Sequence, residues 1–236
     1  MIQIQKVYKS KHFQYLNSFN NRVLLQILYF CQNSEIEFMN RICVFCGSSM
    51  GFRGSYKIMA VKLAEQFLKE NITLIYGGAN VGLMKILADT MLKYNGEVIG
   101  IMPKNLVEKE VAHNELTKLI VVDSMQERKR LMAEMSDAFI AMPGGFGTFD
   151  ELAEMLTFNQ LRIHDKPLGL LNVENYFINL LLFFDHAVNE GFVRKEHRDN
   201  IIVENSVETL LKNLKAYCPV KMEKWIKDIK TESNLH

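Results

Sequence analysis

The chain alternates short runs that are apolar at nearly every position with longer segments in which apolar residues recur at helical spacing. Continuous apolar runs separated by helix-length segments predict parallel strands that are covered by helices on both faces. We therefore predict an α/β fold, a Rossmann-like doubly wound parallel sheet of about seven strands flanked by helices. The expected strands are 41–45, 72–76, 97–101, 118–122, 137–142, 167–171 and 200–203. The expected helices are 55–70, 83–93, 124–135, 148–162, 175–190 and 206–216, and 103–117 is expected to be a polar loop.

The two ends of the chain fall outside this pattern. Residues 1–38 are rich in Asn, Gln, Lys and aromatic residues, and we expect an N-terminal extension there. Their apolar patch, 23–30, lies too far from the start for a signal peptide and is not followed by small residues. The alternating pattern predicts one domain, 39–217, and a polar C-terminal tail, 218–236. No apolar run approaches the roughly 20 residues that span a bilayer, so we expect no membrane partner.

Charge and cysteine content narrow the function classes. The 28 Lys and Arg residues nearly balance 27 Asp and Glu residues, so no basic excess suggests a nucleic-acid partner. The four cysteines form no disulfide framework, and Cys43 and Cys46 lie in an expected strand rather than at a helix start. We expect a reduced cysteine pair in a cytoplasmic protein. The six histidines show no metal-ligand spacing, so no metal is expected.

Three expected strand ends carry glycine-rich turns. Because the carboxyl ends of parallel strands meet at one edge of a sheet, these turns are expected to converge on a ligand there. Neither G-x-G-x-x-G nor G-x-x-x-x-G-K-[ST] is present, which argues against nicotinamide chemistry and nucleoside triphosphate hydrolysis. The turns are Gly47-Ser48-Ser49, Gly77-Gly78 and Gly144-Gly145-Phe146-Gly147.

The last of these turns joins an apolar run to a helical pattern. A helix start of this kind has free backbone N–H groups at the positive end of the helix dipole, which favours an anion such as phosphate. Asp150 and Glu151 are expected in the first turn of the helix. Thr148 and Glu151 have the T-x-x-E spacing of a capping box, whereas a carboxylate beside a bound sugar would have a chemical task. The local pattern leaves both interpretations open.

Several motifs occur in an order and at a spacing that are highly specific. Pro143-Gly144-Gly145-Phe146-Gly147-Thr148-Phe149-Asp150-Glu151 reads P-G-G-x-G-T-x-x-E, and Met125-Gln126-Glu127-Arg128-Lys129 precedes it. Five further segments belong to the same set of motifs: Cys46-Gly47-Ser48-Ser49, Tyr76-Gly77-Gly78, Gly82-Leu83-Met84, Gln160-Leu161-Arg162-Ile163-His164-Asp165-Lys166-Pro167 and Glu190-Gly191-Phe192. On these motifs residues 41–216 resemble the Lonely Guy family, the cytokinin riboside 5′-monophosphate phosphoribohydrolases, some of which are labelled lysine decarboxylases.

The resemblance implies that 39–217 is a nucleotide-binding phosphoribohydrolase domain that needs no cofactor. Such a domain would cleave the N-glycosidic bond of a nucleoside 5′-monophosphate, AMP or a cytokinin riboside 5′-monophosphate, to free base and ribose 5-phosphate. Arg128 and Glu151 match the catalytic pair of the family, Lys129 a substrate-contacting lysine and, more loosely, Glu110 a substrate-contacting glutamate. The expected substrate-binding residues are Gly47, Ser48, Gly77, Gly78, Glu110, Lys129, Gly144, Gly145, Phe146, Gly147, Thr148 and Asp150.

The chemistry of such a site can be argued from the residues themselves. Breaking an N-glycosidic bond builds positive charge on the ribose, and a carboxylate such as Glu151 can stabilise that charge and activate the attacking water. Arg128 would hold phosphate or ribose oxygens with its planar guanidinium. The other interpretation of Arg128 is a solvated charge on a helix face, which suits Arg130 better.

Two expected helices indicate how the protein assembles. The expected helices 148–162 and 175–190 carry more apolar surface than one sheet face needs, which, with the resemblance, predicts a homodimer.

Two other functions stay open. The first is a nucleotide-binding or carrier protein on the same fold, which would not hydrolyse its ligand. A lysine decarboxylase would need a lysine that binds pyridoxal phosphate, and no lysine stands out as a candidate. Ala79 and Lys85 replace glycines that are usual in the family and border the expected pocket, so base preference stays open.

Overall fold

The computed structural model describes residues 39–109 and 112–219, which belong to a unit that begins at Met39. The extension predicted for 1–38, Glu110, and all but the first two residues of the tail predicted for 218–236 lie outside the described residues. Within the described part, seven strands form one sheet. The strands are β1 (Arg41–Phe45), β2 (Thr73–Tyr76), β3 (Val98–Pro103), β4 (Lys118–Val122), β5 (Ala138–Ala141), β6 (Leu168–Leu171) and β7 (Ile202–Glu204).

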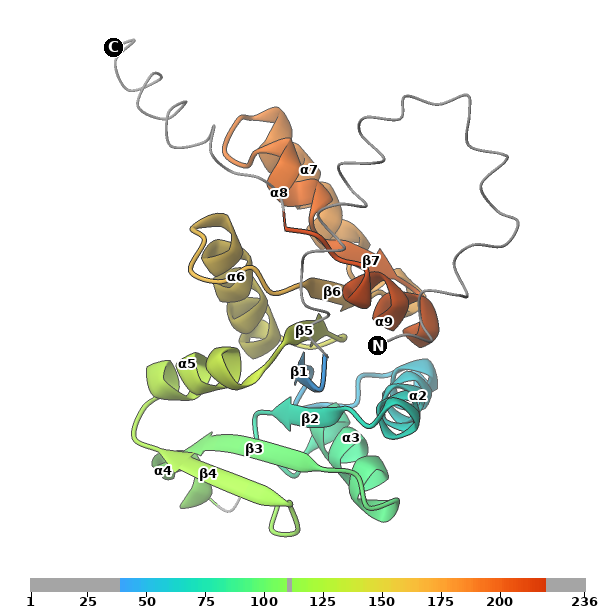
Figure 1. Ribbon diagram of the computed structural model, residues 1–236, viewed down its shortest axis with the longest axis vertical. Coiled ribbons are helices and arrows are strands. Elements are labelled where there is room, and N and C mark those ends of the chain that lie inside the picture. The colour runs from blue at the N-terminus through green and yellow to red at the C-terminus, as the bar shows by residue number, and fades with distance from the viewer. Residues whose placement is uncertain (1–38, 110–111, 220–236) are drawn as a thin grey trace, which may run out of the picture. The chain divides into compact units, whose positions relative to one another are not determined.

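Every neighbouring pair of these strands is parallel, and the order across the sheet is β4-β3-β2-β1-β5-β6-β7 (Figure 1). The predicted α/β fold with a parallel sheet of seven strands is confirmed. The chain fills one half of the sheet outward from β1 and then returns to β5 to fill the other half. The winding direction therefore reverses between β1 and β5, and ligands of such sheets bind at this reversal, beyond the carboxyl ends of the strands.

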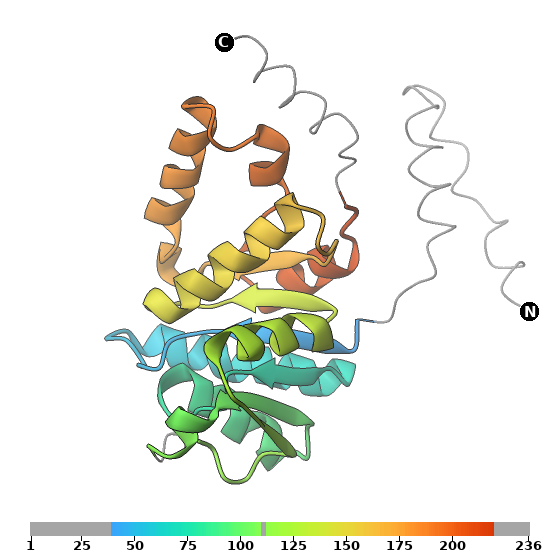
Figure 2. The ribbon, with the colours of Figure 1, turned by 90° about the vertical axis from the view of Figure 1, so that its left-hand side faces the viewer.

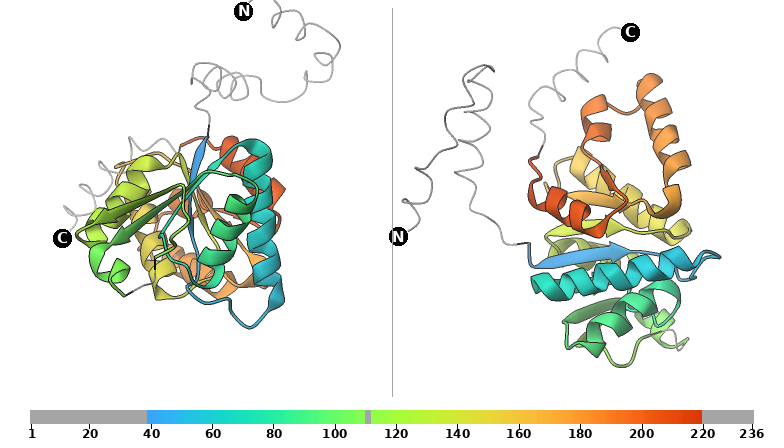
Figure 3. Two further views of the ribbon diagram at one scale, coloured as in Figure 1. Left: turned by 90° about the horizontal axis from the view of Figure 1, so that it is seen from below. Right: turned by 90° about the vertical axis from the view of Figure 1, so that its right-hand side faces the viewer.

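Helices cover both faces of the sheet (Figure 3). Side chains of α2, α3 and α9 pack in the core of one face, and side chains of α5, α6 and α7 pack in the core of the other. The bounds are α2 (Gly54–Glu70), α3 (Gly82–Lys93), α4 (Lys104–Val107), α5 (Met125–Met135), α6 (Phe146–Gln160), α7 (Ile178–Asn189), α8 (Lys195–Asp199) and α9 (Val207–Lys215), with a 3-10 turn, η2 (Val173–Asn175). None of the described helices is long and apolar enough to cross a membrane.

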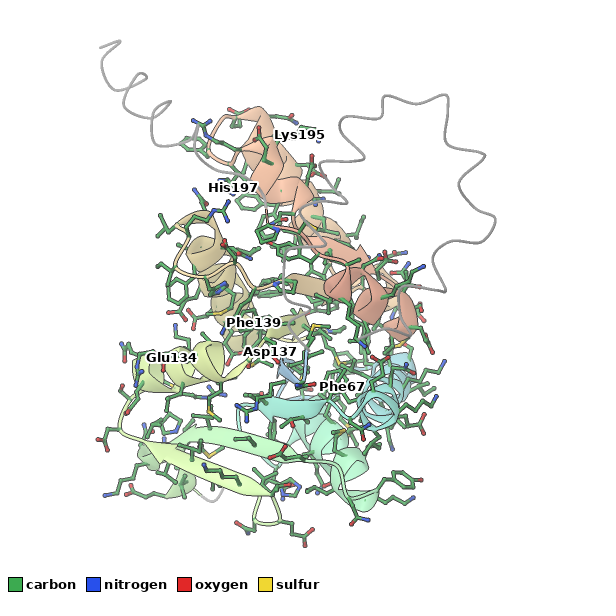
Figure 4. The ribbon with its side chains drawn as sticks, viewed as in Figure 1. Phe67, Glu134, Asp137, Phe139, Lys195 and His197 are labelled. Carbon is green, nitrogen blue, oxygen red and sulfur yellow. The ribbon has the colours of Figure 1, made fainter. Side chains whose placement is uncertain are left out.

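Two apolar cores follow from the alternation of side chains along the strands. On β1, Ile42 points into the core under α2, α3 and α9, whereas Cys43 points into the opposite core. Figure 4 labels one residue of each core, Phe67 of α2 and Phe139 of β5, and both are fully buried. Because both faces of the sheet are covered, the strands are apolar at nearly every position.

The structure differs from the sequence-based elements in three places. The expected loop 103–117 contains the short helix α4, and the segment after α7, for which no element was predicted, contains the short helix α8. Helices of one turn are too short to show a period of apolar residues. The expected helix 175–190 begins only at Ile178, because Glu174 and Asn175 adopt left-handed backbone conformations that interrupt helical geometry.

Candidate active site

The glycine turns at the ends of β1 and β5 lie against each other at the point where the winding reverses. The Gly47 N–H donates to the Pro143 carbonyl at 3.0 Å, and the Leu83 N–H at the start of α3 donates to the Gly47 carbonyl at 3.1 Å. The turn at the end of β2 joins them through Gly77, described below. The structure thus brings all three glycine turns to one edge of the sheet, as the strand pattern predicted.

The start of α6 is set by the glycine turn rather than by a capping box. The N-cap residue is Gly145, and the first backbone bond of the helix runs from the Phe149 N–H to the Gly145 carbonyl at 3.1 Å. The helix therefore begins at Phe146, two residues before the expected start at Thr148, and the capping-box interpretation is wrong because Thr148 lies inside the first turn. The expectation that Asp150 and Glu151 lie in the first turn is also wrong.

The early start leaves a set of backbone donors at the helix end. No described side chain caps α6, and the N–H groups of Phe146, Gly147 and Thr148 belong to the first turn, where a helix has no internal acceptor. The backbone of Gly145 through Gly147 is exposed, whereas Thr148 is buried. These donors lie at the positive end of the helix dipole, an arrangement that suits an anion.

Glu151 lies one turn further along α6 and faces inward. Its side chain is 11% exposed, and its Oε1 lies 3.5 Å from Nη2 of Arg128, whose side chain is also 11% exposed. Figure 2 shows α5 and α6 side by side on one face of the sheet, and this pair joins the two helices. A buried Arg128 also overturns the interpretation of a solvated charge on a helix face.

Arg128 is bonded to the backbone of β3 and lies against the backbone of the turn after β2. Its Nε donates to the Ile101 carbonyl of β3 at 3.0 Å. A Cβ at Gly77 would overlap Nη2 of Arg128, so the guanidinium lies directly against the backbone after β2. Glycine at position 77 is needed for this close approach. The turn Gly77-Gly78 therefore contributes to the site by making room for the arginine.

Burial shapes the charge state of Glu151. Removal of the carboxyl group from water raises the pKa of Glu151 to about 7, and the negative charges of Asp150 and Glu154 act in the same direction. The Arg128 guanidinium and the Lys129 ammonium oppose this shift but do not cancel it. A carboxyl group with a pKa near neutrality can both carry a negative charge and accept a proton at physiological pH, as a general base must.

A second ion pair lies beside the first on the same two helices. Nζ of Lys129 lies 3.1 Å from Oδ2 of Asp150 and 3.0 Å from Oε2 of Glu154. The Asp150 side chain is 61% exposed, in contrast to Glu151. Arg130, the next residue, forms an exposed pair with Glu134, as expected of a solvated helix face.

The structure brings together most of the sequence-predicted site residues, while their roles stay predictions. Arg128, Glu151 and the three glycine turns lie at one edge, and Ser48 is exposed there. Nζ of Lys85 pairs with Asp89 at 3.1 Å and donates to Oδ1 of Asn80 at 2.9 Å. The described residues contain no cluster of three His, Cys, Asp or Glu side chains that could hold a metal ion.

Sequence reasoning missed Tyr176, which lies between β6 and α7. Its hydroxyl donates to the Gly144 carbonyl in the glycine turn before α6. No signal in the sequence could have identified this contact, because Tyr176 lies outside every glycine turn and is separated from Gly144 by 32 positions.

Comparisons with known proteins identify relatives of this chain. A family model described as "Possible lysine decarboxylase" matches residues 84–214. The chain is 46% identical over 179 residues to cytokinin riboside 5′-monophosphate phosphoribohydrolase LOG1 of Arabidopsis thaliana, which covers 76% of this chain and 84% of the relative. It is equally similar, at 46% over 179 residues, to the probable cytokinin riboside 5′-monophosphate phosphoribohydrolase LOGL5 of Oryza sativa subsp. japonica, covering 76% and 73% of the two chains.

Solved structures share the fold at lower identity. The molybdenum cofactor binding protein of Rippkaea orientalis is 26% identical, with a TM-score of 0.57, and the match covers 75% of this chain and 95% of that one. The molybdenum cofactor carrier protein of Chlamydomonas reinhardtii is 22% identical with a TM-score of 0.57, covering 75% and 98%. The second likeness concerns the fold alone.

Proposed function

The chain belongs to the Lonely Guy family of cytokinin riboside 5′-monophosphate phosphoribohydrolases, and on this premise we propose that it hydrolyses nucleoside 5′-monophosphates. The substrate would be AMP or a cytokinin riboside 5′-monophosphate, and the products the free base and ribose 5-phosphate. The observation that carries the proposal is the buried pair of Arg128 and Glu151, which lies one helical turn from the uncapped start of α6.

The substrate's phosphate would bind at the start of α6. The N–H groups of Phe146, Gly147 and Thr148 offer donors for its oxygens, and the helix dipole favours its negative charge. With the phosphate there, the ribose would lie about one turn along the helix, beside Glu151. One nucleotide would then have its phosphate at the start of α6 and its anomeric carbon beside Glu151.

The reaction would use the carboxylate of Glu151 twice. As the bond between the anomeric carbon and the base nitrogen breaks, its electron pair leaves with the base and positive charge builds on the ribose, next to the carboxylate. A water oxygen then bonds to the anomeric carbon, and Glu151 accepts the proton that this water loses. The proton that Glu151 has accepted then passes to the nitrogen of the departing base, which restores the carboxylate and gives neutral base and ribose 5-phosphate.

Arg128 would keep Glu151 ready for this task. Its positive charge lowers the pKa of the carboxyl group, which burial alone would raise further, so part of the population stays ionised near neutrality. With Nε bonded to the Ile101 carbonyl, Nη2 is directed toward Glu151, and Nη1 points to Met125. The arginine is therefore fixed before substrate arrives, which suits a preorganised site.

The test is base release by the full chain from a panel of nucleoside 5′-monophosphates, with adenosine as the matched compound that lacks the phosphate. We expect free adenine from AMP and almost none from adenosine, because only AMP has the anion that the start of α6 binds. Binding of AMP without any base release would favour a nucleotide carrier. Equal affinity for adenosine and AMP in calorimetry would contradict the phosphate site.

We also propose that the protein acts as a cytoplasmic homodimer. Ile178, Leu182 and Phe183 of α7 are exposed apolar side chains, which helix-on-helix contact with a second copy would bury. The buried free thiols of Cys43 and Cys46 suit a reducing compartment. Sedimentation that shows only monomer at micromolar concentration would contradict the dimer.

A further inference from the structure

The turn between β6 and α7 reaches across to the proposed phosphate site. The Tyr176 hydroxyl donates to the Gly144 carbonyl, one residue before the N-cap of α6. A tyrosine hydroxyl has one proton to donate, and here it is used on the glycine turn. Tyr176 can therefore influence the site through the backbone of Gly144 without donating to a ligand.

Tyr176 is held in place by a strained and anchored turn. Glu174 and Asn175, the two residues before it, have φ angles of 53° and 57°, a left-handed conformation that non-glycine residues seldom adopt. The turn is fixed at both ends by Asn172, whose N–H donates to the Glu204 carbonyl at 2.8 Å and whose Oδ1 accepts the Phe177 N–H at 2.8 Å. Such strain persists only where the surrounding structure imposes it, and it is found near functional sites.

The same tyrosine also packs on the start of α2, which follows the turn after β1. Its ring meets the Tyr56 ring edge-on, with 6.0 Å between centroids and 82° between planes. Tyr56 in turn covers Gly51, where a Cβ would lie 2.7 Å from the ring. Nη1 of Arg53, the residue before α2, lies 3.5 Å from Oε2 of Glu174 in the same turn as Tyr176. The turn between β6 and α7 thus contacts both the glycine turn before α6 and the start of α2.

We propose that Tyr176 is a positioning residue for the phosphate site. Gly144 and Gly145 have no side chains to restrict the peptide between them, and a flip of that peptide would turn the Gly144 carbonyl oxygen toward the bound anion. The hydrogen bond from Tyr176 holds this oxygen away. The N–H groups of the first turn of α6 are then directed at the position of the phosphate before substrate binds. This inference rests on the proposed phosphate site at the start of α6.

Tyr176→Phe tests the inference because it keeps the ring and removes only the hydroxyl. We expect ribose 5-phosphate and AMP to bind roughly tenfold more weakly in calorimetry, the scale of one lost hydrogen bond. Adenosine binding should not change, and kcat at saturating AMP should stay within about threefold of wild type, so the loss appears in KM. Tyr56→Phe is the matched control: it removes a hydroxyl from the same aromatic pair, and no hydrogen bond of that hydroxyl occurs among the described residues.

Three results would overturn the inference. The first is a Tyr176→Phe protein that binds ribose 5-phosphate as tightly as Tyr56→Phe. The second is an equal loss of affinity for adenosine and AMP, which would indicate general loosening of the site. The third is a fall in kcat with unchanged KM. If the wild-type protein releases no base but Tyr176→Phe still weakens ribose 5-phosphate binding, the inference stands and the proposed hydrolysis fails.

Discussion

Two ion pairs join the same two helices, one residue apart, and they differ in almost every physical property. Arg128 and Glu151 are 3.5 Å apart, and each side chain is 11% exposed. Lys129 and Asp150 are 3.1 Å apart, and the aspartate is 61% exposed. Successive residues of a helix point about 100° apart, so one step along α6 turns the carboxylate from the interior to the solvent, whereas Lys129 on α5 stays largely covered.

The difference shows how this edge of the sheet combines a stable contact with a reactive group. In the outer pair, Lys129 and Asp150, the aspartate keeps most of its hydration although the Lys129 side chain is only 18% exposed, and the contact holds the helices together at small cost. The inner pair gives up hydration that a single 3.5 Å contact does not replace, and the pKa of Glu151 is therefore raised to about 7. A buried carboxylate such as that of Glu151 lowers the stability of the folded protein, and such groups are expected where a reaction needs their charge.

The largest expected effect is the loss of turnover on Glu151→Gln. The substitution preserves size but removes the charge that would stabilise the oxocarbenium-like state and accept a proton from water. We expect base release from AMP to fall by a factor of about 10² to 10⁴, the usual contribution of a general base. Glu134→Gln, which breaks an exposed ion pair on α5, is the control and should keep wild-type activity. Near-normal turnover by Glu151→Gln would mean that the Arg128–Glu151 pair has no more part in catalysis than the Lys129–Asp150 pair.

The next effect is a gain in stability from the same substitution, and it depends on pH. The pKa of Glu151 is about 7 in the folded protein against 4.5 for an ordinary glutamate, so ionisation of the unfolded chain lowers wild-type stability as pH rises between these values. Glu151→Gln does not lose stability in this way, because its side chain does not ionise. We expect it to unfold like wild type below pH about 4 and to be more stable by up to about 3 kcal/mol above pH about 8.

Thermal unfolding of both proteins from pH 4 to 9 measures this gain. A constant difference in melting temperature across the range would mean that packing, and not ionisation, separates the two proteins. A wild-type protein that is the more stable of the two at pH 8 would mean that Arg128 fully offsets the burial of Glu151. Either result would make the inner pair resemble the outer one.

The sheet was predictable from sequence, because strands that are covered on both faces must be apolar at nearly every position. Convergence of the glycine turns followed from that topology alone. The start of α6 was not predictable, since T-x-x-E at 148–151 is a valid local cap. What the local pattern lacks is Arg128, which attracts Glu151 inward from another helix.

The burial of Arg128 and the role of Tyr176 also depend on contacts between distant segments. Arg128 is buried because its Nε meets the Ile101 carbonyl and its guanidinium fits over Gly77, neither of which is a sequence neighbour. Tyr176 meets Gly144 only because β5 and β6 are adjacent in the sheet. Periodicity identifies the face of an element, but it does not report which backbone atom a side chain reaches.

The smallest expected effect is that of Asp150→Asn in the outer pair. The side chain is mostly exposed, so loss of its contact with Lys129 should lower stability by less than about 1 kcal/mol. Its charge also raises the pKa of Glu151, and removing it should move the acid limb of the pH profile for base release to lower pH. Glu134→Gln, which removes an exposed acid of similar exposure further along α5, should leave that limb in place. The sequence resemblance instead predicts that Asp150 contacts substrate. An increase of tenfold or more in the KM for AMP would support that contact, and the outer pair would then belong to the site as fully as the inner one.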